Sequence, residues 1–282
     1  MNTRSLPPDR SEVATEQAHP SLQRLDEMET VELVRFLASD QGRAIEAVLE
    51  IVDELAVLID TVVAALNRGG RLVYLGAGTS GRLGVLDASE CPPTFNSLPE
   101  QVLGVIAGGD DALRRSSEGA EDDPAGVESE FERLNVCADD VVLGIAAGGT
   151  TPWVLGGLDR ARERGAATAL VSCAPRKCPQ GCDHLIVIPT GPEPLTGSTR
   201  LVAGTATKVF LNTLTTSVFT KLGKIRGNRM IDLRATNEKL HDRCLRILCE
   251  LFPELDRAEA DRTLSAAGGR LREAVETYEE AQ

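Results

Sequence analysis

The sequence contains few aromatic residues and few histidines, and each shortage narrows the range of functions. Aromatic residues make up 3% of the 282 residues, so aliphatic side chains must fill the core that a hydrophobic content of 42% supports. Only three histidines are present, which disfavours histidine-rich metal catalysis. The length suits one large α/β domain with a smaller appendage.

Positive charge is also scarce. Thirty lysines and arginines stand against 43 acidic residues, giving a net charge of −13. This balance predicts no nucleic-acid partner, and an anionic ligand would have to be held by local donors. No apolar run approaches the roughly 20 residues of a membrane helix, and the first residues contain no apolar signal region. We therefore expect no membrane partner and a cytoplasmic location.

The seven cysteines are odd in number and spread along the chain, which argues against a disulfide framework. Cys173, Cys178, Cys182 and His184 have a spacing that could suggest a metal site. However, the group contains no Cys-x-x-Cys pair, and His184 opens an apolar run that predicts a strand. We favour free loop thiols and expect no metal ion.

Apolar strands and helical patterns alternate through the middle of the chain. Strands are predicted at 72–75, 102–107, 141–146, 167–172 and 185–189, and helices at 30–40, 42–66, 82–88, 112–119, 152–164 and 199–222. This alternation predicts an α/β fold: a three-layer α/β/α sandwich with a mostly parallel sheet. The loops after residues 75, 106, 146 and 189 should lie at one edge of that sheet, where ligands bind.

The two ends of the chain differ from this middle part. Residues 1–20 are polar and expected to be extended, and a helical N-terminal segment follows them. Purely helical patterns at 237–252, 255–266 and 269–279 predict a small C-terminal helical appendage. We therefore divide the chain into residues 1–56, an α/β domain at 57–222 and a C-terminal segment at 223–282.

The first loop of the predicted sheet is rich in glycine and hydroxyl groups. Gly76–Gly81 includes Gly78, Thr79 and Ser80 and leads into a predicted helix. Backbone N–H groups at such a helix start form a cradle for phosphate. The loop lacks the Gly-Lys-Ser/Thr of a Walker motif. It fits Gly-x-Gly-x-x-Gly, but the acid expected at the end of the next strand is missing, because Asp110 lies beyond two glycines. NAD binding is therefore disfavoured, and we expect no cofactor.

A second group of hydroxyls precedes the long predicted helix. Ser198 and Thr199 fall at its expected N-cap, where free N–H groups lie. Simple capping explains any one of these hydroxyls. Several such loops at one sheet edge favour a phosphate site.

Two acidic segments accompany these loops. The first contains Asp87 and Glu90, and the second contains Glu118 and Glu121. A lone surface acid is usually only a solvated charge. Glu90 precedes Cys91-Pro-Pro, which predicts a rigid apolar turn where partial burial would suit a carboxyl to acid–base chemistry.

With these motifs, the chain resembles the N-acetylmuramic acid 6-phosphate etherase family of the sugar isomerase (SIS) superfamily. The matching strings are Gly69–Thr94, Ile106–Gly109, Glu118–Asp122, Thr196–Arg200, Ala203–Lys208 and Thr236–Leu240. The resemblance implies a SIS-type fold, a phosphorylated amino sugar as substrate, and no metal or nicotinamide. It also implies a homodimer with the ligand near the subunit interface.

The resemblance further implies a reaction and a set of residues. The family cleaves the lactyl ether at C3 of the sugar, giving N-acetylglucosamine 6-phosphate and D-lactate. Opening of the sugar ring acidifies the C2 proton; a base removes it, an acid protonates the departing oxygen, and water then adds. By resemblance Glu90 is the proton donor and Glu121 the base, while Thr79, Ser80, Ser198 and Thr199 hold the phosphate.

The chain departs from the family pattern in two places. Gly148 and Thr150 stand where the family usually has serine and arginine, and Leu201-Val202 stands where it usually has Met-Lys. Thr150 or Thr151 could substitute as neutral donors, or the substrate could differ. The alternatives are therefore a non-catalytic sugar-phosphate regulator and a SIS etherase or isomerase with another phosphosugar substrate.

Overall fold

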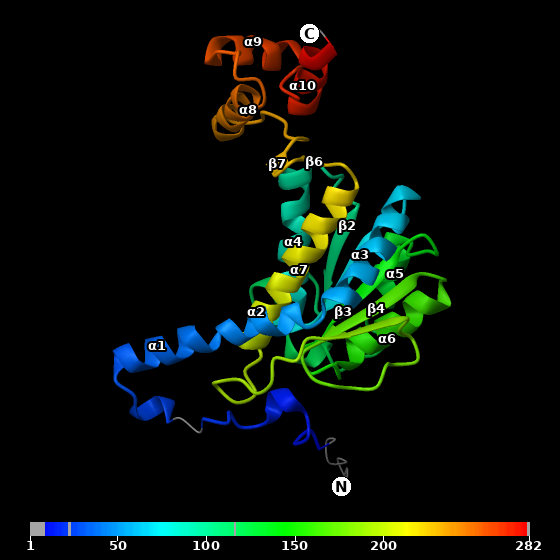
Figure 1. Ribbon diagram of the computed structural model, residues 1–282. Helices are drawn as coiled ribbons and strands as arrows, with labels where there is room; N and C mark the ends of the chain where they lie inside the picture. Colours follow the sequence, from blue (N-terminus) through cyan, green and yellow to red (C-terminus); the bar gives the residue numbers. More distant parts are fainter. Residues whose placement is uncertain (1–8, 22–23, 116, 281–282) are drawn as a thin grey trace.

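Five parallel strands form the central sheet in the computed structural model, which describes residues 9–21, 24–115 and 117–280 (Figure 1). The strand order is β2-β1-β3-β4-β5. The strands are β1 (Leu72–Gly76), β2 (Val102–Ile106), β3 (Val141–Ile145), β4 (Ala167–Ser172) and β5 (His184–Val187). The predicted parallel sheet is thus confirmed, with strand ends within a few residues of those expected.

The register brings the carboxyl ends of the strands to one edge. Gly76 pairs with Ile106 on one side and Ile145 on the other, and Ile145 pairs with Val171. The loops that follow these strands therefore start at the same level. This carboxyl edge is where ligands bind in parallel α/β sheets.

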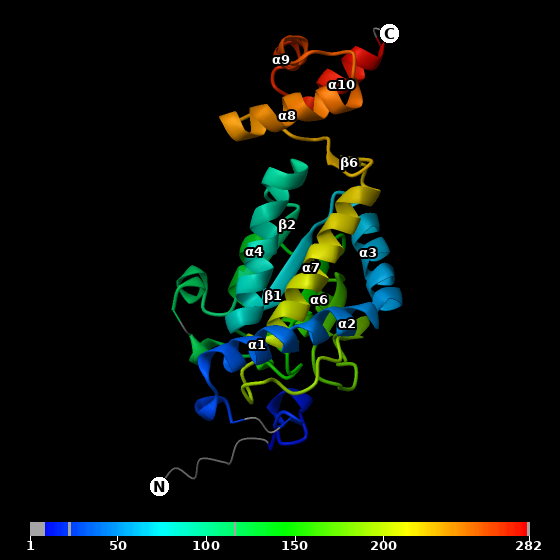
Figure 2. The ribbon, with the colours of Figure 1, turned by 60° about the vertical axis from the view of Figure 1, so that its left-hand side comes forward.

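Helices cover both faces of the sheet. On one face lie α3 (Val52–Asn67), α4 (Gly78–Phe95) and α7 (Val202–Lys221), with α2 (Gly42–Leu49) packed against α7. On the other face lie α5 (Glu128–Leu134) and α6 (Pro152–Glu163). Each face buries its own aliphatic cluster, and the three-layer sandwich expected from the alternation is confirmed (Figure 2).

Two predicted helices differ in the structure. The helix expected over 42–66 is broken at Ile51, whose φ of −112° and ψ of 24° leave helical geometry. Apolar spacing continues on both sides of the break, so periodicity could not reveal it. The helix expected over 112–119 is wrong: the described residues of this range, which do not include 116, form only short 3-10 turns, η3 (Asp110–Leu113) and η4 (Glu118–Ala120).

Arg82 explains the second difference. Its guanidinium donates to the main-chain oxygens of Ala112 (2.7 Å), Leu113 (3.1 Å) and Arg115 (3.3 Å). A helix would have supplied those carbonyls with partners from its own next turn. A side chain from α4 instead satisfies them, and the segment stays irregular.

The N-terminal segment reaches the carboxyl edge. Of the residues expected to be extended, 1–8 lie outside the described part, and Ala14–Glu16 form a short 3-10 turn, η1, that buries Thr15 completely. A second turn, η2 (Leu25–Glu27), precedes α1 (Thr30–Asp40), which projects from the body (Figure 1). Gly148 and Gly197 of the edge loops lie close to Thr15 and Glu16 respectively.

The C-terminal helices build a separate apolar cluster. A short hairpin of β6 (Ile225–Arg226) and β7 (Arg229–Met230) leads to α8 (Glu238–Leu251), α9 (Arg257–Ala266) and α10 (Leu271–Glu280). Asp256 and Glu259 form a capping box at the start of α9. Figure 2 shows this group beyond the ends of α4 and α7. The division at 56/57 and 222/223 remains our proposal; helix α3 runs through the first of these points.

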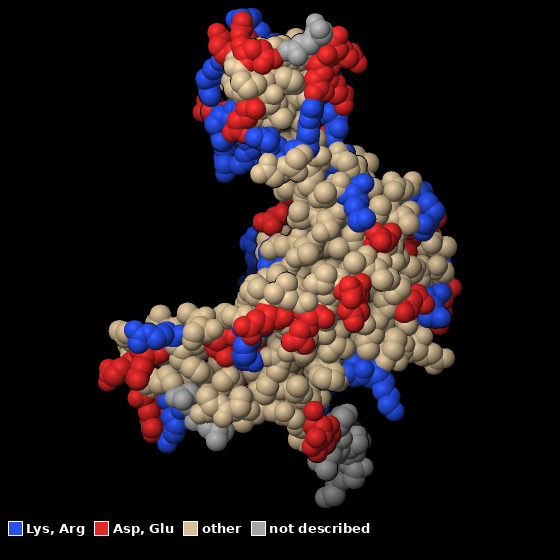
Figure 3. All heavy atoms as spheres, viewed as in Figure 1, with Lys and Arg blue, Asp and Glu red and all other residues tan. Residues whose placement is uncertain are grey.

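Charged side chains crowd the C-terminal helices in Figure 3, while the visible surface between them and α2 is mostly uncharged. Among the described residues, no helix has both the length and the apolar character needed to cross a bilayer.

Candidate functional site

The first loop is tighter than the sequence predicts. Helix α4 begins at Gly78 rather than at Arg82, so Thr79 and Ser80 lie in its first turn. A Cβ on Gly81 would come within 2.6 Å of the Gly76 carbonyl oxygen, and a Cβ on Gly76 would meet the Gly81 nitrogen at the same distance. The two glycines therefore let strand and helix approach closely. Both hydroxyls stand where a helix N-terminus favours an anion.

The third loop leads from β3 into α6 at the same edge. Thr151 occupies the N-cap of α6, Pro152 follows it, and Thr150 is exposed. The main-chain N–H of Trp153 donates to the carbonyl oxygen of Glu121 at 2.9 Å. The segment carrying Glu121 is thereby fastened beside the first turn of α6. Glu121 and the two threonines thus lie together at the carboxyl edge.

The second hydroxyl pair does not cap the long helix, which corrects our expectation. Helix α7 begins at Val202, and Ser198 and Thr199 lie in the turn before it. The fully buried Glu193 accepts from the N–H groups of Val202 (2.8 Å) and Ala203 (3.0 Å). Burial raises the pKa of Glu193, and these two hydrogen bonds oppose the rise. The helix start is therefore already occupied by a carboxylate.

The turn before α7 nevertheless meets the first loop. A Cβ on Gly204 would lie 3.7 Å from the Cγ2 of Thr79 and 3.3 Å from the carbonyl oxygen of Thr199. Arg43 of α2 holds the preceding segment, donating to the carbonyl oxygens of Thr190 and Pro192. The structure therefore brings the hydroxyl loops together, with Ser198 and Thr199 in the turn rather than at the helix start.

Glu90 lies in a different place from the one expected. Pro92 and Pro93 lie inside α4, so no turn follows Glu90, and its side chain is 60% exposed. Its Oε2 lies 3.4 Å from the Nζ of Lys208 on α7. The prediction of a partly buried acid at an apolar turn is therefore wrong, because the helix continues through the prolines and keeps Glu90 on its outer side.

A buried carboxyl, Asp87, lies one turn before Glu90. Its Oδ2 accepts from the hydroxyl of Tyr74 at 2.9 Å, and its Oδ1 lies 3.3 Å from the Oγ1 of Thr215 and 4.0 Å from the Nζ of Lys208. Burial raises the pKa of Asp87 to about 6, against the effect of the Tyr74 hydrogen bond and the Lys208 charge. Lys208 thus contacts a buried and an exposed carboxyl at once.

The two proposed catalytic carboxyls are not placed alike. Glu121 is at the carboxyl edge, beside α6. Glu90 follows Gly78 by twelve residues in α4, or about 18 Å along the axis at a rise of about 1.5 Å per residue. Ser80, at the hydroxyl end of the helix, precedes Glu90 by ten residues, or about 15 Å along the axis.

The thiols of the cysteine group contact main-chain oxygens. The thiols of Cys173, Cys178 and Cys182 donate to the main-chain oxygens of Ala203, Cys182 and His184. Burial raises the pKa of Cys173 and of Cys182 to about 12. In the described part of the chain, no three His, Cys, Asp or Glu residues form a group that could hold a metal ion.

Sequence reasoning missed two residues of this edge. Glu193 lies between prolines in the loop, and its partners are nine and ten residues away, beyond the range of capping patterns. Arg176 follows β4 in a polar stretch with no periodicity, and its stem lies against Gly149. The Gly-Pro-Glu-Pro string was the only available signal for Glu193, and we find none for Arg176.

Comparisons with known proteins agree with this architecture. The profile of the glucokinase regulatory protein N-terminal SIS domain matches residues 54–162. The structure of c3406 from E. coli CFT073 superposes with a TM-score of 0.52 at 20% identity, covering 71% of this chain and 97% of that one. That likeness supports the fold.

Much closer relatives exist in sequence. The N-acetylmuramic acid 6-phosphate etherase of Crocosphaera subtropica is 51% identical over 268 residues, covering 95% of this chain and 88% of the relative. The enzyme of the same name from Gloeobacter violaceus is 50% identical over 269 residues, with the same coverage. Identity of this extent spans the sheet, its edge loops and the C-terminal helices, and the chain therefore belongs to the N-acetylmuramic acid 6-phosphate etherase family.

Proposed function

We propose that this protein cleaves the D-lactyl ether of N-acetylmuramic acid 6-phosphate, giving N-acetylglucosamine 6-phosphate and D-lactate. The observation that carries the proposal is the 51% identity to a relative of that name, over a span that includes both carboxyls and the hydroxyl loops. The reaction class is that of a carbon–oxygen lyase.

The arrangement of the edge supports a division of roles. Glu121, fastened beside α6, would remove the C2 proton of the ring-opened sugar. Thr79, Ser80, Thr150, Thr151, Ser198 and Thr199 would hold the 6-phosphate at the carboxyl edge. Glu90 would protonate the departing ether oxygen and then activate the water that adds to the unsaturated aldehyde.

The direct test is incubation of the protein with N-acetylmuramic acid 6-phosphate, followed by an assay for D-lactate. We expect stoichiometric D-lactate and N-acetylglucosamine 6-phosphate. Absence of lactate at high protein concentration, with calorimetric binding of the substrate intact, would instead favour a non-catalytic regulator. The match to the glucokinase regulatory protein domain is the observation that favours a non-catalytic regulator as the second candidate.

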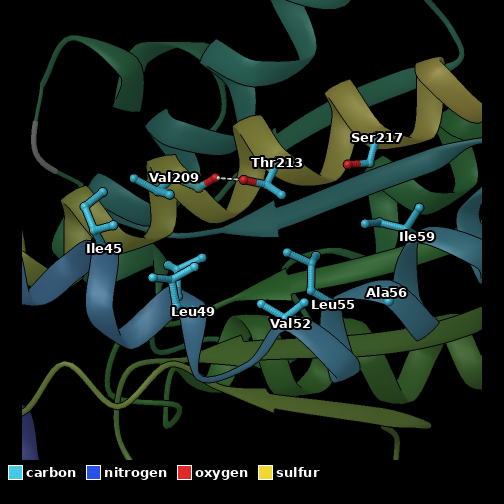
Figure 4. A pocket seen from close by; sticks show the side chains of 10 residues that line it. Ile45, Leu49, Val52, Leu55, Ala56, Ile59, Val209, Thr213 and Ser217 are labelled. Atoms are coloured by element: carbon cyan, nitrogen blue, oxygen red, sulfur yellow. Dashed lines mark hydrogen bonds between the residues drawn. The ribbon is translucent and has the colours of Figure 1, made fainter.

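We also propose a homodimer in which Glu90 acts on the ligand held by the partner subunit. The support is the separation of about 15 Å between Ser80 and Glu90 along one helix, which is longer than the path from the 6-phosphate to the C3 oxygen of one substrate. An apolar groove of about 290 Å³ between α2, α3 and α7 offers a surface for a second copy. In Figure 4 Ile45, Leu49 and Val52 face Val209 and Thr213 across it.

Exposure of the groove supports an interface there. Ile45, Leu49 and Val52 are 48%, 67% and 52% exposed, which is unusual for neighbouring aliphatic residues. Light scattering should give the mass of a dimer. Leu49→Asp should shift it toward a monomer, whereas Leu98→Asp, a similarly exposed control outside the groove, should leave it unchanged. A monomeric wild type would contradict the shared-site proposal.

Mixing two inactive variants tests whether the site is shared. Glu90→Gln and Glu121→Gln homodimers should each be nearly inactive. Subunits refolded together in equal amounts should recover about a quarter of wild-type activity, because half of the dimers are mixed and one site of two in these is intact. Continued inactivity of the mixture would place both carboxyls in one chain's site.

The cytoplasmic location remains a prediction.

A further inference from the structure

A guanidinium lies beside the altered third loop. Arg176 comes from the segment after β4, and its Cδ would be 2.7 Å from a Cβ on Gly149. Gly149 has a φ of 69°, and its lack of a side chain leaves room for the arginine stem. The Nη1 of Arg176 is buried and has no hydrogen-bond partner among the residues that the structure describes. Its Nε donates to the carbonyl oxygen of Lys177 at 3.1 Å.

A second unsatisfied group approaches the same loop from the other end of the chain. Thr15 is fully buried, and its Oγ1 lacks a partner in the described part of the molecule. A Cβ on Gly148 would be 3.9 Å from this Oγ1 and 3.7 Å from the Oγ1 of Thr150. Thr15 and Arg176 therefore flank the Gly148–Gly149 turn.

Unpartnered buried donors are costly, and native proteins rarely keep them without a ligand or an ordered water. Burial also lowers the pKa of Arg176, although the nearby cysteines oppose this effect. A bound anion would accept a hydrogen bond from Nη1 and offset the free-energy cost of burying the guanidinium without a partner. A purely structural arginine would be expected to find a carboxylate or a carbonyl for Nη1.

We infer that Arg176, assisted by the hydroxyl of Thr15, binds an anionic oxygen of the substrate at the third loop. Arg176 would supply the cation that position 150 lacks in this chain. The inference deepens the proposed function, on which it rests for the identity of the ligand. The substrate carries two anions, a phosphate and a lactyl carboxylate, and we favour the phosphate because the N-terminus of α6 opens at this loop.

The variants Arg176→Met, Arg176→Lys and Thr15→Val test this site. Methionine keeps the stem that packs at Gly149 and removes the charge. Lys177→Met is the matched control. It removes an equal positive charge at the neighbouring position, where the side chain is exposed. Thermal melting verifies that each variant folds.

Calorimetric titration separates the two anions without requiring turnover. N-acetylglucosamine 6-phosphate carries the phosphate alone, and N-acetylmuramic acid carries the carboxylate alone. We expect Arg176→Met to weaken binding of N-acetylglucosamine 6-phosphate about 10- to 100-fold, with little effect on binding of N-acetylmuramic acid. Arg176→Lys should restore part of the lost affinity. Lys177→Met should bind both probes as the wild type does. In turnover, KM should rise far more than kcat falls.

The opposite pattern, with only N-acetylmuramic acid weakened, would overturn the phosphate assignment. Unchanged binding of both probes by Arg176→Met would overturn the site itself, even if the protein releases lactate. Conversely, loss of phosphate binding in a protein that makes no lactate would support the site and count against the etherase function alone. Thr15→Val should weaken phosphate binding about 3- to 10-fold without lowering the melting temperature, because its hydroxyl is unsatisfied in the free protein.

Discussion

The turns after β1 and after β3 occupy equivalent places at the carboxyl edge, yet their glycines serve different purposes. In the first turn Gly76 and Gly81 touch each other's backbone, and a Cβ on either would come within 2.6 Å of main-chain atoms. In the third turn a Cβ on Gly148 would meet nothing nearer than 3.7 Å. The first turn is sterically fixed at both glycines, whereas the third has room for a side chain at position 148 but not at Gly149, whose φ is 69°.

We relate this difference to the places where the sequence keeps and departs from the family pattern that it resembles. The string from Gly76 through Glu90 keeps that pattern, and the close contact between strand and helix at Gly76 and Gly81 restricts change there. At Gly148 and Thr150 the fold places little steric demand on the side chain, so these two positions can change. Arg176 lies against the altered turn, and a cation can therefore be provided from a different segment.

The largest effect should come from a methyl group in the first turn. In Gly81→Ala the Cβ would come within 2.6 Å of both the Gly76 carbonyl oxygen and the Cγ1 of Ile106. The strand and helix would have to separate, and we expect the free energy of unfolding to fall by about 3 kcal/mol or more. Activity should fall together with stability, because Thr79 and Ser80 lie in the first turn of the displaced helix.

Urea denaturation measures the stability change, and Gly42→Ala provides the control. Gly42 lies in a helix with nothing within 4 Å of an added Cβ, so alanine there should be neutral or stabilising. A Gly81→Ala variant as stable as the wild type would show that the first turn is no more constrained than the third.

Most of the edge could be predicted from the sequence, because it follows from strand order. Apolar runs separated by glycine-containing loops predicted the five strands, and the parallel sheet then placed Thr79 and Thr151 at one edge. The start of α4 at Gly78 could not be predicted this way. Its first residues have the composition of a loop, but Gly81 packs closely against Gly76 and its N–H donates to the carbonyl oxygen of Ala77 at 3.2 Å.

The remaining misses have long-range causes. Glu193 caps α7 from a loop, Arg82 keeps residues 112–115 out of a helix, and Arg176 packs on a turn 27 residues away in sequence (176 − 149). Each depends on a single side chain crossing between elements. Local propensity and periodicity contain no information about such contacts.

The pH dependence of stability gives a second test, on the helix that the first turn positions. The pKa of Asp87 is raised from 3.8 to about 6, so the folded state holds a proton that the unfolded state releases earlier. Stability from this group is therefore present below pH 3.8 and lost as the pH rises to 6. The span of 2.2 pKa units (6 − 3.8) corresponds to about 3 kcal/mol.

Asp87→Asn removes this titration while keeping a group that can accept from Tyr74. Relative to the wild type, the variant should gain stability by about 2 to 3 kcal/mol between pH 4 and pH 6 and show no further change above pH 7. Urea denaturation across this range measures the difference, and Asp53→Asn, at an exposed position of α3, is the control. Parallel curves for wild type and Asp87→Asn would contradict the burial argument.

The smallest effect separates the two turns most directly. Gly148→Ser returns the hydroxyl that the family usually has, in a space bounded by Thr150 at 3.7 Å and Thr15 at 3.9 Å. Stability should change by less than about 0.5 kcal/mol, and binding of N-acetylglucosamine 6-phosphate should tighten about fivefold through one added hydrogen bond. Gly149→Ala, one residue away, should instead weaken binding, because its φ of 69° and the Cδ of Arg176 at 2.7 Å leave no room. Equal effects from the two substitutions would mean that the third turn is as constrained as the first, and its altered sequence would then need another explanation.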